Sequence, residues 1–240
     1  MPILCICRSA NAQKLIYFYN IRMAFLASDP EFKWLKELGI EEECNGIYDG
    51  TWKRGNGAEL ISMCPINGRP IARVKSATAA EYNDVIAASV AAFKIWRQVT
   101  APKRGEIVRQ IGDELRSKIH LLGRLEALEV GKTAVEGRGE VQEFVDVCDY
   151  AVGMSRMLPG QVLPSERAGH DLLERWNPLG PCAVITAFNF PIAVYGWNAA
   201  IAMIAGNTCI WKPSPTAILS TIATQKIIAT VLERNNLPGK

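Results

Sequence analysis

The longest uninterrupted apolar patterns of this chain lie in its final third. Residues 183–188 form a short, partly β-branched apolar run, which is typical of a strand buried on both faces of a sheet. Residues 192–205 carry no charge and precede Gly206, as in a deeply buried helix that ends at a glycine. A second apolar strand over residues 208–211 and a longer helix from Thr216 follow. The order strand, helix, strand, helix predicts a parallel βαβα unit with a right-handed crossover.

Two polar side chains follow these predicted strands. Asn189 comes just after the first strand, and Lys212 comes just after the second. Because ligands bind at the carboxyl ends of the strands in open parallel sheets, we expect both side chains to project into one shared cleft. This cleft is the predicted functional site.

The first half of the chain carries a hairpin pattern followed by helical patterns. Residues 59–64 and 69–74 are strand-like, and the Asn-Gly pair at 67–68 suits a tight turn because both residues tolerate positive φ. Residues 78–96 have apolar positions at helical spacing, which predicts an amphipathic helix with one buried face. Pro102 opens the next predicted helix, where its missing N–H costs nothing.

Three helices are predicted after Pro102. Apolar residues line the first helix over 107–115 and a separate second helix over 121–128, and a third pattern covers 135–150. Together with the parallel unit, these elements predict an α/β fold. In it, a partial Rossmann-like parallel sheet is preceded by helices and a β-hairpin.

Composition narrows the class of protein. The chain has 240 residues, 49% of them hydrophobic and 21% charged, as in a globular chain of one or two domains. Its net charge of +3 does not indicate a nucleic-acid or membrane partner, and no apolar run reaches the roughly 18 residues that span a bilayer. Seven scattered cysteines favour a reducing compartment, and two distant histidines disfavour a metal site.

The N-terminal 28 residues differ from the rest of the chain. They contain no Asp or Glu but carry Arg8, Lys14 and Arg22, which is typical of an organellar transit peptide. A disordered extension over residues 1–28 explains the same composition, and both interpretations stay open. The predicted location is therefore cytoplasmic or mitochondrial, and residues 29–240 are predicted to form the folded part.

A family resemblance comes from two motifs at a fixed spacing. The motifs are N-P-L-G-P-C-A-V-I-T-A-F-N-F-P at 177–191 and G-N-T-C-I-W-K-P-S at 206–214. Together they resemble the NAD-dependent aldehyde dehydrogenase superfamily, whose chains are considerably longer, and the stretches at 101–107, 128–132 and 140–146 agree with it. The resemblance is nearest to the branch that oxidises α-aminoadipic semialdehyde in lysine catabolism.

The resemblance implies a role for Asn189. In this superfamily a cysteine thiolate attacks the aldehyde, hydride passes to the nicotinamide, and a water activated by a glutamate hydrolyses the thioester. The side-chain amide at the position of Asn189 donates to the oxyanion of the tetrahedral intermediate. Loss of one such donor costs on the order of a hundredfold to a thousandfold in rate. The alternative is that an asparagine between two aromatic residues is a structural turn residue.

Cofactor residues are implied in the same way. Lys212 matches a lysine that hydrogen-bonds the adenosine ribose of NAD, and Thr186, Ala187 and Phe188 match a backbone segment that lines the cofactor. Many members have a glutamate where this chain has Pro215. Its absence removes a charge that would repel a 2′-phosphate, so the choice between NAD and NADP stays open.

Substrate and partner residues complete the implied site. Glu143 and Phe190 match substrate contacts, and a carboxylate such as Glu143 suits the cationic amine of the substrate. A solvated glutamate on a helix surface is the alternative reading of Glu143. The extended segment near 156–178 matches a β-arm that pairs with another subunit, which implies a homo-oligomer.

The chemistry of this superfamily also needs groups that do not match any residue before Lys240. These are the glycine-rich loop for the pyrophosphate, the general-base glutamate and the nucleophilic cysteine with its catalytic domain. We therefore expect residues 29–240 to be the N-terminal part of the cofactor-binding domain, truncated before the catalytic domain and inactive alone. The alternative is an inactive truncated product that binds nucleotide weakly or associates with full-length subunits.

Two other nucleotide-binding classes fit poorly. A P-loop at 131–133 would need a glycine where Glu126 stands. A short-chain Rossmann dehydrogenase would need G-x-G-x-x-G after the first strand and a Tyr-x-x-x-Lys motif, and the chain has neither.

Overall fold

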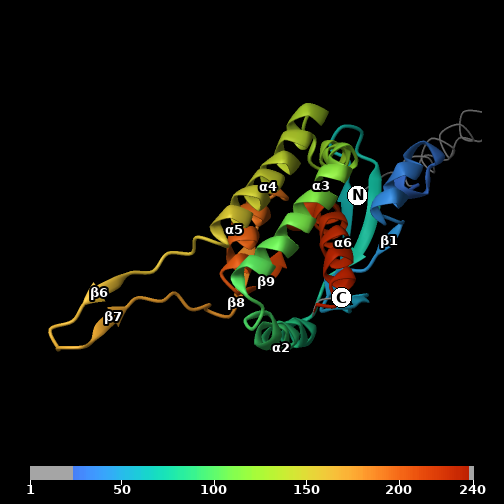
Figure 1. The fold of residues 1–240 in the computed structure, drawn as a ribbon. Helices are drawn as coiled ribbons and strands as arrows, with labels where there is room; N and C mark the ends of the chain where they lie inside the picture. The colour runs from blue at the N-terminus through green and yellow to red at the C-terminus, as the bar shows by residue number, and fades with distance from the viewer. Residues whose placement is uncertain (1–23, 238–240) are drawn as a thin grey trace, which may run out of the picture.

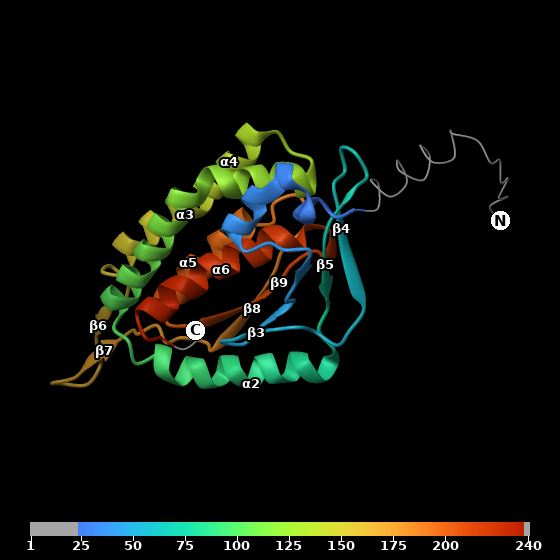
Figure 2. The same ribbon diagram turned by 90° about the vertical axis from the view of Figure 1, so that its right-hand side faces the viewer.

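The computed structural model describes residues 24–237 as a layered α/β arrangement (Figures 1 and 2). Two long helices, α3 (Ala101–Val130) and α4 (Ala134–Met154), form the outer layer. Helices α5 and α6 lie beneath them, and strands β8 and β9 lie beneath those helices. Helix α2 (Ala79–Trp96) runs along the opposite side of the two strands (Figure 2).

The predicted βαβα unit is confirmed. Strand β8 (Pro181–Ile185) leads into α5 (Ala193–Ile204), and β9 (Thr208–Lys212) leads through the short 3-10 helix η3 (Pro215–Ala217) into α6 (Ile218–Arg234). The two strands pair in parallel. The α/β class expected from the apolar pattern is therefore correct.

The predicted burial of the first strand on both faces is wrong. Only Val184 of β8 is buried, and the Ile185 side chain is 69% exposed. Within the described residues β8 and β9 pair only with each other, so their outer edges and much of one face stay uncovered. Apolar strand residues are therefore exposed here although their composition is that of a buried parallel sheet.

The stretch Pro215–Arg234 is apolar enough, with a mean hydropathy of 1.3 over 18 residues, and long enough to cross a membrane by composition alone. In the structure 61% of that window is buried inside the protein. Its α-helical part, α6, packs against α3. The hydropathy of this stretch is therefore explained by its position in the core.

The predicted hairpin is also confirmed, with strands β4 (Glu59–Met63) and β5 (Pro70–Lys75) paired antiparallel. Only Gly68 in its turn has positive φ, at 66°, so the expectation of a left-handed Asn67 is wrong. The Asn67 side chain instead accepts a hydrogen bond from the Arg69 N–H at 2.9 Å. A capping side chain thus stabilises the turn where a second left-handed residue was expected.

Three short strands in the polar N-terminal region were not predicted. β1 (Glu43–Cys44) pairs in parallel with β5, and β2 (Ile47–Tyr48) pairs with β3 (Trp52–Lys53). Each has two residues, which is too short for an alternating pattern to be recognised.

The packed part of the chain begins before Asp29. The 3-10 helices η1 (Leu26–Ser28) and η2 (Pro30–Leu38) lie against β5 and α3, and Leu26 is completely buried. Of the segment 1–28 that was predicted to be a transit peptide or a disordered extension, residues 1–23 lie outside the described residues.

Helix α2 is less buried than its amphipathic pattern predicts. Its N-terminus is stabilised by a capping box between Thr78 and Glu81. Of its residues only Trp96 is buried, and Tyr82 is 52% exposed. The apolar side of α2 faces a groove instead of a packed core.

The region 101–130 is one helix of 30 residues, so the prediction of two helices is wrong. The chain contains no breaking residue between the two apolar patterns, and α3 ends at Gly131 with φ of 82°. Inside α3, Gly123 lies against Gly137 of α4. A Cβ on Gly137 would come within 2.4 Å of the Gly123 carbonyl oxygen.

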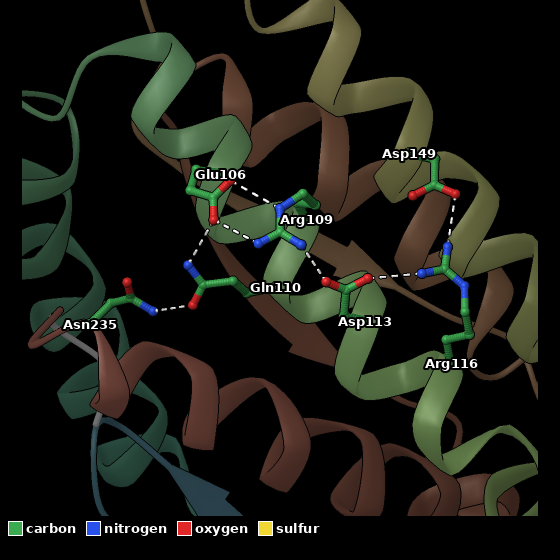
Figure 3. Close-up of polar contacts among 7 residues, drawn as sticks. All are labelled: Glu106, Arg109, Gln110, Asp113, Arg116, Asp149 and Asn235. Carbon is green, nitrogen blue, oxygen red and sulfur yellow. Dashed lines mark hydrogen bonds and ion pairs between the residues drawn. The ribbon is translucent and has the colours of Figure 1, made fainter.

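Polar side chains connect α3 to its neighbours on the surface, as Figure 3 shows. Arg116 reaches Asp149 of α4 at 2.9 Å, and Asn235 after α6 donates to Gln110 at 2.7 Å. Exposed pairs of this kind contribute little to stability, at most about 1 kcal/mol each. The close packing of the helices therefore contributes more to the stability of the protein than these polar pairs do.

The hairpin arm projects from the body of the protein (Figure 1). It consists of β6 (Val162–Pro164) and β7 (Asp171–Leu173), which pair antiparallel, and every residue of both strands is exposed. A two-stranded hairpin without a partner is only marginally stable in water.

Replacing Gly137 by alanine should destabilise the protein by about 1–3 kcal/mol, because the added methyl group collides with α3 backbone. Gly139 in the same helix has open space around it, so Gly139→Ala should stabilise by up to about 1 kcal/mol through helix propensity. Urea unfolding followed by circular dichroism measures both. Equal stability of the two variants would contradict the close contact between α3 and α4.

Candidate functional site

The candidate site lies at the carboxyl edge of the parallel pair. The register places Ile185 opposite Lys212, and the Thr186 N–H donates to the Lys212 carbonyl oxygen at 3.1 Å. Residues 188–192, here called the Asn189 turn, follow directly and lead into α5. Lys212 is thus the last residue of β9 and not the residue after the strand, as was expected, whereas Asn189 follows the end of β8. Both residues lie toward the carboxyl edge of the parallel pair.

Lys212 lines a groove of about 880 Å³ between α2, β9 and α6, which we call the α2–β9 groove. Trp211, Pro213 and Ile218 line it as well. Residues 186–190 do not line this groove. The two predicted groups therefore share an edge of the sheet without opening into one cavity, so the expected shared cleft is not observed in the described residues.

The predicted cofactor segment divides into one buried and two exposed residues. Thr186 is 3% exposed, and its Oγ1 accepts a hydrogen bond from the Trp211 indole N–H at 2.9 Å. Ala187 and Phe188 are exposed. The Thr186 hydroxyl already accepts this bond inside the protein, whereas the two residues after it face outward.

Asn189 is exposed, and its side-chain amide has no hydrogen-bond partner among residues 24–237. The next residue, Phe190, is 39% exposed and packs near the ring of Trp197. On another side of the Phe190 ring, the Lys132 Nζ lies 4.3 Å from the ring centroid, a cation–π contact. The amide of Asn189 is thus available to a ligand.

Glu143 lies on α4, away from both strands in sequence, and is half-buried. It takes part in no ion pair within the described part of the chain. Its neighbour Phe144 contacts Tyr195 edge-on, and Tyr195 stacks on Trp211 with the ring centroids 3.8 Å apart. This aromatic series connects α4, α5 and β9.

The structure reveals buried glutamates that the sequence reasoning did not interpret. The first is Glu140 of α4, whose side chain is 1% exposed. Its Oε1 accepts hydrogen bonds from the N–H groups of Ile192 at 2.8 Å and Ala193 at 3.1 Å, at the start of α5. Its Oε2 forms an ion pair with Lys132.

Glu129 of α3 caps the start of α6 in the same way as Glu140 caps the start of α5. It accepts from the N–H groups of Leu219 and Ser220 at 2.8 and 2.7 Å, and from the hydroxyls of Ser220 and Ser62. Burial raises the pKa of Glu129, whereas these bonds favour its ionised form. With donors on both oxygens and at a helix N-terminus, we regard the carboxylate as ionised.

A signal for these contacts exists in the sequence. Helices α5 and α6 both lack a capping side chain of their own. Since the first N–H groups of a helix need partners when they are buried, acceptors from elsewhere in the chain were to be expected. The motifs at 128–132 and 140–146 contain these acceptors, Glu129 and Glu140. Which helix each of them caps depends on the tertiary arrangement and could not be deduced from the sequence.

A third buried carboxyl, Glu126, has no donor to either oxygen within the described residues. Burial raises its pKa far above the usual value near 4.5, and the charge of Glu140 raises it further. The carboxyl group is thus buried beside a like charge without a donor that would stabilise its ionised form. Glu126 is therefore a neutral acid at physiological pH.

The described cysteines are free thiols that resemble packing residues more than nucleophiles. Burial raises the pKa of Cys148 and of Cys209 to about 12, and it raises that of Cys44. Since the thiolate is the reactive form, these groups are inert at neutral pH. No group of three His, Cys, Asp or Glu side chains suited to a metal ion occurs in residues 24–237.

A parallel βαβ unit with polar groups at its carboxyl edge is typical of α/β proteins that bind ligands at that edge. Comparison with known sequences narrows this class, since residues 52–238 match the model of the "Aldehyde dehydrogenase family". This chain belongs to that family.

Its relatives define the branch. It is 55% identical over 241 residues to "Alpha-aminoadipic semialdehyde dehydrogenase" of Bos taurus, covering 99% of this chain and 44% of that protein. It is 54% identical to "Aldehyde dehydrogenase family 7 member B4" of Arabidopsis thaliana, covering 89% and 42% of the two chains. The chain thus spans less than half the length of these relatives, and the branch expected from the motifs is confirmed.

Solved structures agree with the fold. A crystal structure of an aldehyde dehydrogenase from Brucella melitensis biovar abortus 2308 is similar with a TM-score of 0.77 and 27% identity, covering 87% of this chain and 41% of that one. A structure of "3,6-anhydro-L-galactose Dehydrogenase in Complex with NAP" has a TM-score of 0.75 at 27% identity, covering 82% and 41%.

The protonated state of Glu126 makes a pH-dependent prediction. Because its pKa is higher in the folded than in the unfolded state, unfolding releases a proton above about pH 5, and stability falls as pH rises. In Glu126→Gln the side chain is neutral in both the folded and the unfolded state, so its unfolding releases no proton from this position. Its stability relative to wild type should therefore increase by about 1.4 kcal/mol per pH unit between pH 5 and 8, measured by urea unfolding. Parallel pH profiles for the two proteins would show that Glu126 is ionised.

Proposed function

We propose that this chain is the N-terminal part of the cofactor-binding domain of an NAD-dependent aldehyde dehydrogenase. The reaction is the oxidation of α-aminoadipic semialdehyde and related aldehydes to carboxylic acids. One observation carries the proposal: Asn189 is exposed just beyond β8, at the carboxyl edge of a parallel strand pair whose other strand ends at Lys212. The substrate class rests on the 55% identity to the Bos taurus protein.

In this proposal Asn189 donates its side-chain N–H to the aldehyde oxygen. As a nucleophile adds to the carbonyl carbon, that oxygen becomes negatively charged, and the amide stabilises the charge as it develops. Such a donor works best when its direction is fixed before the reaction. The turn before α5 supplies this rigidity because its following residues are buried.

The proposed cofactor is NAD, which accepts the hydride from the aldehyde carbon when it is bound. Lys212 is exposed at the wall of the α2–β9 groove, where its ammonium group can donate to ribose hydroxyls. Residues 186–188 would line the cofactor through their backbone. Since Pro215 brings no carboxylate to repel a 2′-phosphate, NADP is the second candidate.

Glu143 and Phe190 are the proposed substrate contacts. Glu143 is half-buried without an ion-pair partner in the described region, so its carboxylate can receive the amino group of the substrate. The partly exposed ring of Phe190 would contact the carbon chain of the aldehyde. Both roles follow from the branch to which the chain is similar.

The hairpin arm is the proposed contact with an identical subunit. Its strands expose four large apolar side chains, Val162, Leu163, Leu172 and Leu173. A second copy would cover these side chains and pair with the open strand edges. The same exposed arm favours the second candidate function, in which this chain associates with full-length subunits without catalysing the reaction itself.

A chimera tests the proposal, with this chain replacing the matching 44% of the Bos taurus enzyme. Oxidation of α-aminoadipic semialdehyde with reduction of NAD is expected. Asn189→Ala should then lower kcat by a factor of about 100 to 1,000 with little change in KM, because the donor acts on the transition state.

Asn198 supplies a matched control. It is an exposed asparagine on α5 whose side chain donates to the Val194 carbonyl oxygen. Asn198→Ala should leave kcat unchanged. A chimera that folds but keeps full activity with Asn189→Ala would refute the oxyanion role.

A further inference from the structure

The Asn189 turn is held in place from the outer helical layer. Lys132 lies in the short connection between α3 and α4. Its Nζ sits over the Phe190 ring, 4.3 Å from the centroid, while it pairs with Glu140 of α4. Its side chain is only 11% exposed, so water competes weakly for the ammonium group.

Glu140 holds the other end of the same turn. Its Oε1 accepts the N–H groups of Ile192 and Ala193, at 2.8 and 3.1 Å. The contacts of Lys132 and Glu140 therefore fall on either side of Pro191, which is buried and whose φ is fixed by its ring.

These contacts hold the residues that directly follow Asn189, namely Phe190, Ile192 and Ala193. The amide of Asn189 forms no hydrogen bond of its own within residues 24–237, so its direction depends on the residues that follow it. Helix α5 begins directly after the turn and has no capping side chain of its own. The ion pair supplies from 52 residues away the acceptor that the local sequence lacks.

We propose that Lys132 and Glu140 are positioning residues that fix the Asn189 turn from both sides of Pro191 and so set the direction of the Asn189 amide. Their importance for catalysis rests on the proposed function. Their effect on the turn does not, since it follows from contacts within this chain.

Glu129 offers a control for a purely structural role. It is a buried carboxylate that accepts the first N–H groups of a helix, as Glu140 does, but that helix is α6. The Glu129 contacts do not include the Asn189 turn. Glu129→Gln and Glu140→Gln should both reduce stability, while only the second should disturb Asn189.

Nuclear magnetic resonance of the chain under native conditions tests the positioning. In Glu140→Gln we expect the Asn189 side-chain amide resonances to shift or broaden. Hydrogen exchange at Ile192 and Ala193 should rise about tenfold, since a neutral acceptor replaces a charged one. In Glu129→Gln the exchange should rise at Leu219 and Ser220, with Asn189 unchanged.

Lys132 is tested by a pair of variants. Lys132→Met removes the charge that faces Glu140 and Phe190, and should move the Asn189 resonances. Lys132→Arg keeps the charge and should restore them, which loss of folding alone would not explain. If Lys132→Met does not fold, the comparison of Lys132→Arg, Glu140→Gln and Glu129→Gln decides the question.

The proposal is overturned if Glu140→Gln leaves the Asn189 resonances and the exchange at Ile192 and Ala193 as in wild type. It is equally overturned if Glu129→Gln changes them as much. In the chimera, Glu140→Gln should lower kcat about tenfold at constant KM, with Glu129→Gln near wild type. If Asn189→Ala leaves kcat unchanged, the proposed function fails, while the resonance data still decide the positioning.

Discussion

Two buried carboxylates, Glu129 and Glu140, join the outer helices α3 and α4 of this protein to its inner helices α6 and α5. Each accepts the first N–H groups of an inner helix that has no capping side chain of its own. The far end of α5 is held in a similar way, because Arg104 and Trp96 donate to the Ile204 and Met203 carbonyl oxygens. Buried helix ends need such partners, so the position of the inner layer, and with it the strand edge, depends on them.

This constraint explains why the candidate site is formed by residues far apart in the sequence. The Asn189 turn follows β8, yet its contacts come from Lys132 and Glu140 in the region of α3 and α4. Lys212 lies at the same strand edge but opens into the α2–β9 groove. The two predicted groups therefore share a strand edge but face different surroundings.

The apolar pattern was sufficient to predict the βαβα order and the hairpin, because strand and helix periods are local properties of a sequence. The apolar pattern gave wrong predictions where tertiary contacts determine the length or the exposure of an element. The two patterns within Ala101–Val130 form one helix because no residue breaks it. Strand β8 is largely exposed because, in the part of the chain that the structure describes, only β9 pairs with it. In the site, Asn189 and Lys212 could be located from the predicted strand ends. The role of Glu140 could not be predicted, because it depends on the tertiary contact between α4 and the start of α5, which no local pattern encodes.

Replacement of Glu129 tests most directly whether buried carboxylates organise the structure. Glu129→Gln should lower the free energy of unfolding by about 2–4 kcal/mol, because a buried charged acceptor is lost from an uncapped helix. Glu136, the exposed capping-box residue of α4, is the comparison, and Glu136→Gln should cost less than about 1 kcal/mol. Urea unfolding of the two variants gives both values. Equal losses, or no loss for Glu129→Gln, would contradict the account.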